Sequence, residues 1–247
     1  GDRDSAVLSA VSAKTIAEIC RVHVPQAGYD ALAEVVLQDA VVLVRSPRRW
    51  GTTTTAIRLL GPMGAVHELR FSGPLPTLPV EDMPERCGFV LSQVSRAQLA
   101  ELHERDLLTL QDRLTKRHSR LVAIFDTSVR VHDPAIQRRA IDMVAPPPAV
   151  NLVTSHMADR LSWERAKQFL ADHDLAARLE ALDVDSFDVR QLVEFARDLS
   201  DAAQDRCSIE EAVTRFDERS RQDLEAWLDE IVGYDQKAAM VSLAVLD

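Results

Sequence analysis

The most constraining feature of the sequence is a short apolar segment that runs directly into a threonine-rich one. Residues 40–44 read Ala-Val-Val-Leu-Val, which has the length and β-branched composition of a strand buried on both faces. An arginine-rich loop follows at residues 45–51, and residues 52–60 have the composition of a helix. A strand, a loop and a helix N-terminus in this order suit phosphate binding, because the free N–H groups of the helix point at the anion. This stretch therefore predicts an α/β unit with a candidate phosphate site.

Apolar periodicity predicts further elements of both kinds around this unit. Runs typical of strands occupy four more segments, residues 66–71, 87–94, 121–125 and 150–154. Helical spacing is found in three more, residues 1–21, 29–37 and 135–144. Because strands that alternate with helices favour a parallel sheet covered on both faces, we expect an α/β core with its sheet sandwiched by helices.

Two capping boxes predict long helices in the rest of the chain. Ser95 with Gln98 begins a helix whose apolar face carries Leu99, Leu102, Leu107, Leu110 and Leu114. Ser208 with Glu211 begins another, and everything beyond about residue 158 has helical periodicity. We therefore expect three parts, namely an N-terminal helix (1–21), an α/β core (22–158) and an all-helical subdomain (159–247).

Composition narrows the class of protein. The 247 residues carry a net charge of −10, which argues against a dedicated nucleic-acid binder, and residues 172–237 alone carry 19 acidic and 8 basic side chains. The three cysteines are widely spaced, no apolar run approaches the length of a membrane span, and residues 1–4 do not resemble a signal peptide. We expect a cytoplasmic protein. Arginine makes up 25 of the 29 basic residues, which hints at a GC-rich bacterial genome.

The loop before the threonine-rich helix can be aligned with the phosphate-binding motif G-x-x-x-x-G-K-[ST]. The alignment places Gly51 at the second glycine and Ser46 at the first. Thr52 then stands at the lysine that neutralises phosphate, and Thr53 at the hydroxyl that binds Mg²⁺. The motif is thus present in outline but lacks its principal charge.

Two later segments match other parts of such a site. The strand at 121–125 followed by Asp126 has the form of a Walker B strand, and Thr127 replaces the glutamate that would polarise the attacking water. Thr154, at the end of the strand expected at 150–154, is placed where a polar sensor residue is expected.

On these residues, segment 22–154 resembles a P-loop NTPase of the AAA+/STAND type with degenerate Walker motifs. Its sequence looks like an actinobacterial group of such proteins in four segments, 24–31, 41–44, 54–60 and 87–91. The resemblance implies a P-loop NTPase-like parallel sheet followed by a lid-like helical subdomain. It also implies a switch that oligomerises, as STAND relatives do.

The departures from the motif predict that hydrolysis is lost. Thr52 removes the charge that offsets the γ-phosphate, Ser46 restricts a glycine position, and Thr127 removes the water-positioning acid. We therefore expect a pseudo-NTPase, a regulatory or assembly module of a bacterial signalling or defence protein that works by protein–protein association and needs no cofactor. Its vestigial or atypical nucleotide site would comprise Arg48, Arg49, Gly51, Thr52, Thr53, Asp126 and Thr154.

Other interpretations stay open. One is an ATP- or GTP-binding switch in which Arg48 or Arg49 replaces the lysine, Thr53 binds Mg²⁺ and Asp126 lies in the outer coordination shell. Another is a nucleic-acid-binding regulator that uses residues 45–49 and 113–120, and a third is an ordinary βα unit unrelated to nucleotides.

Protein partners or self-association are expected at a cluster of exposed side chains. Arg45, Arg48 and Arg49 would meet an acidic partner, such as the helical half of another copy, and Trp50 would act as an aromatic anchor. The seven histidines lack the spacing of a metal site, so none is expected. Residues 238–246 are almost entirely apolar, which suggests that the chain is one segment of a longer protein.

Overall fold

The computed structural model describes residues 6–100, 102–182 and 188–231, the last ten of them by their backbone only. A six-stranded sheet in the order β1-β3-β4-β5-β2-β6 forms its centre. The strands are β1 (Val7–Ala10), β2 (Val41–Arg45), β3 (Ala65–Arg70), β4 (Cys87–Val94), β5 (Arg120–Phe125) and β6 (Ile141–Asp142). All pairings are parallel except that of β1 with β3. The expected α/β fold, a mostly parallel sheet flanked by helices, is confirmed.

The strand predicted from residues 40–44 lies inside the sheet, between β5 and β6. Its side chains alternate between two apolar clusters, one on each face. Val42 and Val44 pack into the cluster on one face, and Val41 and Leu43 into the cluster on the other. Burial on both sides explains why the segment is apolar at every position rather than at every second one.

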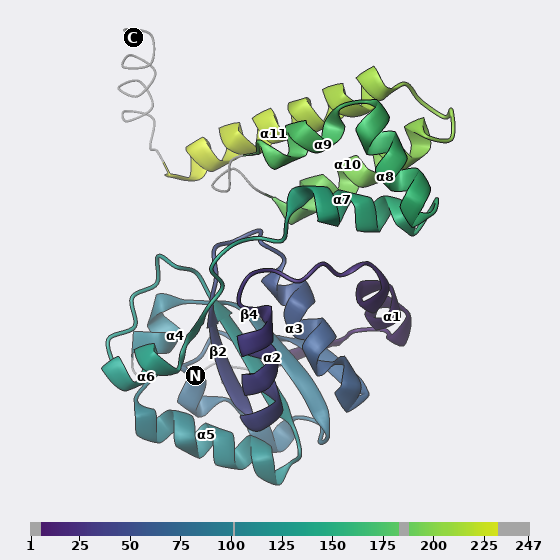
Figure 1. Ribbon diagram of the computed structural model, residues 1–247. Helices are drawn as coiled ribbons and strands as arrows, with labels where there is room; N and C mark the ends of the chain where they lie inside the picture. Colours follow the sequence, from purple (N-terminus) through teal and green to yellow (C-terminus); the bar gives the residue numbers. More distant parts are fainter. Residues whose placement is uncertain (1–5, 101, 183–187, 232–247) are drawn as a thin grey trace, which may run out of the picture.

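Helices cover both faces of this sheet (Figure 1). On one face lie α2 (Tyr29–Gln38) and α3 (Thr52–Leu60), and α1 (Ala13–Val22) packs on α3. The other face is covered by α4 (Arg96–Ala100), α5 (Glu104–Lys116) and α6 (Pro134–Arg139). Short 3₁₀ turns connect the elements at Gly61–Met63, Leu75–Thr77 and Val80–Asp82.

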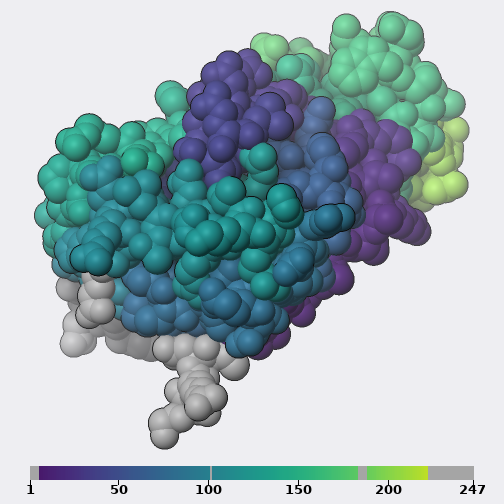
Figure 2. Space-filling view, turned by 90° about the horizontal axis from the view of Figure 1, so that it is seen from below, coloured from purple at the N-terminus to yellow at the C-terminus, as the bar shows by residue number. Residues whose placement is uncertain are grey.

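The helical subdomain sits on one end of the α/β core. It comprises α7 (Ala149–Ala158), α8 (Trp163–Asp172), α9 (Leu175–Glu180), α10 (Val189–Ala202) and α11 (Ile209–Ile231), with α10 packed between α7 and α11. Figure 2 views the molecule from the opposite end, with the core in front and the green and yellow subdomain projecting past it at the upper right. The expected capping box of α11 is present, since the Ser208 amide donates to Glu211 and the Glu211 amide donates to Ser208 Oγ.

Two expectations near the start and middle of the chain are wrong. Residues 1–21 do not form a helix, because Val7–Ala10 pair antiparallel with β3 and α1 begins only at Ala13. The long helix expected from Ser95 is two helices. Its capping box is present, but α4 ends at Ala100 and a new box begins α5, in which the His103 amide donates to Asp106.

The strand expected at 150–154 is also wrong, since these residues belong to α7. Pro148 precedes the helix and carries no amide hydrogen for a ladder, and Leu152, Val153 and Met157 are buried in the cluster shared with α8 and α10. Packing on other helices therefore overrides the strand preference of the β-branched residues. Because α7 packs with the helical elements, the helical part begins near Ala149 rather than at residue 159. Residues 238–246 lie outside the described part of the chain.

Candidate functional site

The loop between β2 and α3, residues 46–51, is closed by its own side chains. Ser46 continues the sheet, with its amide donating to the carbonyl of Phe125. Its Oγ lies 2.6 Å from Thr52 Oγ1, and both residues are buried, 2% and 5% exposed. Arg49 and Gly51 adopt positive φ angles of 70° and 79°, which lets the chain turn sharply into the helix. The two hydroxyls thus bond to each other across the two ends of the loop.

The arginines around this loop are engaged by carboxylates of the same chain. Arg45 makes two hydrogen bonds, of 2.5 and 2.8 Å, to Asp142, its register partner on β6, and this contact lowers the pKa of Asp142. Arg48 Nε lies 3.8 Å from Asp126 Oδ2, although the Arg48 side chain stays 71% exposed. The pKa of Asp126 is lowered, because hydrogen bonds from Ser128 and the charge of Arg48 together outweigh the opposing effect of burial.

The start of α10 docks on the loop. Asp188 caps α10 by accepting from the Arg190 amide at 2.8 Å, and its buried carboxylate lies 3.7 Å from Arg49 Nε. The Val189 amide donates to the carbonyl of Arg49 at 3.0 Å. Val189 also covers Gly51, where an added Cβ would lie 3.4 Å from either of its methyl groups. The helical subdomain therefore contacts Arg49 and Gly51, two residues of the nucleotide site expected from the sequence.

Sequence reasoning missed Asp188 and Val189. Asp188 falls within the acidic stretch 172–237, and nothing in the local pattern indicates a contact with residues about 140 positions earlier. An aspartate directly before an apolar helix is, however, an N-cap signal that the sequence does contain.

Trp50 is not a surface anchor. The side chain is 9% exposed and belongs to the apolar cluster that also holds residues of α2, α3, α7 and α10. The expectation of an exposed aromatic contact is therefore wrong, because the tight turn at Arg49 and Gly51 directs the indole inward. Arg45, tied to Asp142, is likewise not a free surface cation.

The Thr53 hydroxyl contacts a serine of a neighbouring strand. Thr53 Oγ1 donates to Ser92 Oγ at 3.4 Å, and Ser92 belongs to β4, not β5. In P-loop enzymes the hydroxyl at this position and a Walker B aspartate together hold Mg²⁺. The register of β4 shifts between Leu91 and Val94, where Gln93 takes a φ of 61°. The structure thus brings Thr53 to Ser92 and Asp126 to Arg48, so the two residues expected to share a metal contact different partners.

Thr154 lies away from a strand end. It is 3% exposed within α7, and its Oγ1 donates to the carbonyl of Val150 at 2.7 Å, one helical turn earlier. Its assignment as a sensor residue is wrong, because the hydroxyl is used inside its own helix.

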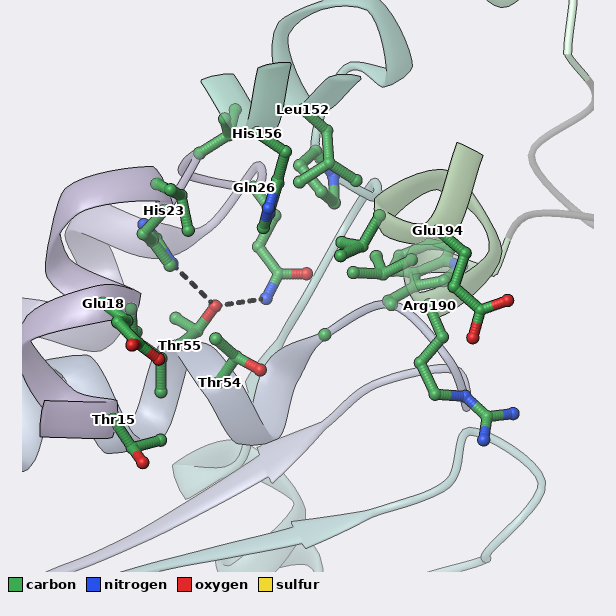
Figure 3. Close-up of a pocket in the computed structure, with 18 of the residues that line it drawn as sticks. Thr15, Glu18, His23, Gln26, Thr54, Thr55, Leu152, His156, Arg190 and Glu194 are labelled. Carbon is green, nitrogen blue, oxygen red and sulfur yellow. Dashed lines mark hydrogen bonds between the residues drawn. The ribbon is translucent and has the colours of Figure 1, made fainter. Parts of the chain in front are cut away.

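A cavity of about 380 Å³ lies beside the loop, between the α/β core and the helical subdomain (Figure 3). Its walls come from α1, the segment before α2, the start of α3, α7 and α10. At its inner end Thr55 Oγ1 accepts from Gln26 Nε2 at 3.0 Å and lies 3.1 Å from His23 Nε2. The sequence predicted none of these residues for the site, since they are recruited from separate elements.

The two histidines that line this cavity are neutral near pH 7. Burial, reinforced by the nearby charge of Arg58, lowers the pKa of His23 to about 4. Burial also lowers the pKa of His156, with the charge of Arg197 adding to the effect and Asp159 opposing it. The inner part of the cavity therefore presents uncharged polar groups.

The residues present do not fit a nucleoside triphosphate with its metal. The lysine is absent, the Thr52 hydroxyl is bonded to Ser46, and the Thr53 hydroxyl contacts Ser92 rather than a carboxylate. Within the described part of the chain, no group of three or more His, Cys, Asp or Glu side chains is arranged to hold a metal ion. None of the helices described combines the length and apolar character that a bilayer crossing demands.

Comparison with protein-family models and with curated proteins found no match. Among solved structures, the chain is similar to C. elegans PCH-2, with a TM-score of 0.44 and 14% identity over 91% of this chain and 77% of that one. It is also similar to a chain in the HORMA:CdnC:Trip13 complex of E. coli MS115-1, with a TM-score of 0.38 and 11% identity over 77% and 79%. Both TM-scores lie under 0.5, so the function is inferred below from this chain's own residues.

Replacing Asp188 tests the docking contact. Asp188→Ala removes an N-cap and leaves Arg49 without its buried carboxylate, so we expect a loss of about 2 kcal/mol in unfolding free energy. Asp188→Asn keeps the cap and should lose less. Ser162→Ala, which removes only the hydrogen bond that caps α8, is the matched control and should cost about 1 kcal/mol. Urea unfolding measures all three, and equal losses for Asp188→Ala and Ser162→Ala would contradict the contact.

The depressed pKa of His23 predicts a pH dependence. Because the unfolded chain binds this proton below about pH 6.5 and the folded chain only below about 4, the contribution of neutral His23 to stability is complete above pH 6.5. It is lost progressively as the pH falls toward 4. In urea unfolding between pH 7.5 and 4.5, His23→Gln should show a shallower fall than the wild type. Parallel curves would show that His23 titrates normally in the folded protein.

Proposed function

We propose that this chain is a P-loop NTPase-like module that does not hydrolyse nucleotide and that acts by protein association. It would serve as a regulatory or assembly element of a bacterial signalling or defence protein. The hydrogen bond between the Ser46 and Thr52 hydroxyls carries the proposal. It joins two buried side chains at the positions of a glycine and a lysine that would otherwise cradle and neutralise phosphate.

Two further contacts support loss of hydrolysis. The loop is held from outside by Val189 and Asp188, so the helical subdomain is positioned by side chains rather than by a bound nucleotide. The Thr53 hydroxyl meets Ser92 in place of a metal-binding carboxylate. An alternative in which Arg48 or Arg49 serves for the lysine gains little support, because both guanidinium groups face carboxylates, Asp126 and Asp188.

An association role is supported by charge distribution. Arg48 is the most exposed cation of the loop, and the helical half carries most of the excess negative charge. A second copy of the chain offers an acidic surface of suitable sign for this loop. Association of this kind would be weakened by salt.

Nucleotide binding gives the direct test of the closed loop. A site filled at 100 times its dissociation constant would raise the unfolding free energy by about 2.7 kcal/mol, but we expect millimolar ATP or GTP with Mg²⁺ to leave the thermal midpoint unchanged. We also expect no phosphate release. The matched variant Ser46→Gly/Thr52→Lys removes the bond between the two hydroxyls and restores the lysine. If nucleotide stabilises this variant but not the wild type, the Ser46 and Thr52 side chains are what prevents nucleotide binding in the wild type. Steady hydrolysis by the wild type would refute the proposal.

Sedimentation at increasing concentration tests association. We expect the wild type to form dimers or larger species whose fraction falls between 50 and 500 mM salt, because the contact is between opposite charges. Arg48→Glu should reduce this fraction. Lys116→Glu makes the same charge change at the C-terminal end of α5, outside the loop, and should leave the associated fraction unchanged. An entirely monomeric wild type, or equal effects of the two variants, would count against Arg48 as a contact.

A further inference from the structure

Another cavity, of about 320 Å³, lies at the opposite end of the sheet from the β2–α3 loop. The residues that line it are Gln38, Ala40, Met63, Thr115, His118, Ser119 and Arg120. They come from the ends of α2 and α5, the 3₁₀ turn after α3, and the start of β5. Because β2 begins at Val41 and β5 at Arg120, the cavity is at the amino ends of these parallel strands, whereas the loop follows the carboxyl end of β2.

Arg120 is a cation for which the chain supplies no partner. The other cations at the end of α5 each face a carboxylate, in the pairs Arg113–Glu81, Lys116–Asp112 and Arg117–Glu85. Within the described part of the chain, the Arg120 side chain makes no ion pair or hydrogen bond, and its Nη1 is buried. Arginine stays protonated in proteins, and buried donors are nearly always paired. Arg120 therefore indicates an anion supplied from outside the chain.

The surroundings of Arg120 suit an anion. None of the described residues that line the cavity is acidic. Asp39, which lies between two of them in the sequence, accepts a hydrogen bond from Gln111 Nε2 at 3.1 Å. The side chains of Gln38, Thr115 and His118 line the cavity and make no hydrogen bond to any described residue. An anion here would thus meet one full positive charge and further polar groups, with no negative side chain in the walls.

The geometry favours a carboxylate over a phosphate. The parallel N–H groups of one guanidinium can bond both oxygens of a carboxylate and neutralise its single charge. A phosphate monoester carries up to two negative charges, of which Arg120 would offset one. The helices α2 and α5 end at Gln38 and Lys116, so the negative ends of their dipoles lie beside the cavity and oppose a second negative charge.

We propose that this cavity binds a small organic monocarboxylate, whose oxygens accept from the Arg120 guanidinium and whose apolar body packs on Met63 and Ala40. The volume lies within the range of sites for small organic ligands. Arg120 is partly exposed and no described residue holds its guanidinium, so the group can turn toward a ligand. The proposal does not depend on the state of the β2–α3 loop, and either the loop or this site can fail its test alone.

Calorimetric titration of the full chain with benzoate and benzamide tests the charge. The two probes share the same ring and nearly the same shape, but only benzoate is an anion. We expect benzoate to bind at least tenfold more tightly, the ratio that a hydrogen bond to a charged group gives. Inorganic phosphate should bind more weakly than benzoate. Equal binding of benzoate and benzamide, tighter binding of phosphate, or no binding of benzoate at millimolar concentration would overturn the proposal.

Two variants test the location. Arg120→Gln removes the guanidinium and should lower the affinity for benzoate at least tenfold, with that for benzamide unchanged. Lys116→Gln removes the same charge four residues earlier, from a side chain that does not line the cavity, and should leave both affinities unchanged. Undiminished benzoate binding in Arg120→Gln, or an equal loss in Lys116→Gln, would refute Arg120 as the partner of the anion.

The variant Arg120→Met separates a binding role from a structural one. Methionine fills a similar length without a charge to match, so without ligand its thermal midpoint should equal or exceed that of the wild type. Millimolar benzoate should raise the midpoint of the wild type and leave that of Arg120→Met unchanged. A lower midpoint for Arg120→Met, or an equal rise in both proteins, would show that the guanidinium serves the fold rather than a ligand.

Discussion

The contact between the first residues of α10 and the β2–α3 loop determines how the two parts of this molecule relate. Val189 donates to the Arg49 carbonyl and covers Gly51, while the buried Asp188 carboxylate both caps α10 and faces Arg49. A buried carboxylate is stable only when its charge is paired and its oxygens accept hydrogen bonds. Asp188 meets both needs here, so the helix start and the loop depend on each other. A ligand phosphate would compete for the same donors and the same space.

The same contact lies between two regions of the molecule, the β2–α3 loop and the cavity beside it. On one side the loop is closed by Ser46 and Thr52, and its cations face Asp126, Asp142 and Asp188. On the other side an open cavity remains, and among the described residues no donor reaches the Gln26 carboxamide oxygen at its inner end.

Local signals in the sequence were sufficient for much of the core. The strand predicted at 40–44 is found at 41–45, and the helix predicted at 52–60 is found there, because burial on both faces and helical periodicity are properties of neighbouring residues. Both capping boxes were predicted for the same reason, since each involves residues three positions apart. Where local and tertiary preferences disagreed, as in residues 150–154, packing of α7 against α8 and α10 decided the outcome.

By itself the sequence determined which chemical groups the loop lacks. The absence of lysine at position 52 and of glycine at position 46 is independent of any fold. Only the tertiary structure decided what fills their place. Strand order placed Ser92 rather than Asp126 against Thr53, and the turn at Gly51 buried Trp50. Packing of separate elements brought Asp188 to Arg49 and Gln26 to Thr55. The partners in these contacts are separated by 29 to 139 residues in the sequence. Such contacts form only when whole helices and strands pack together, so no local periodicity predicts them.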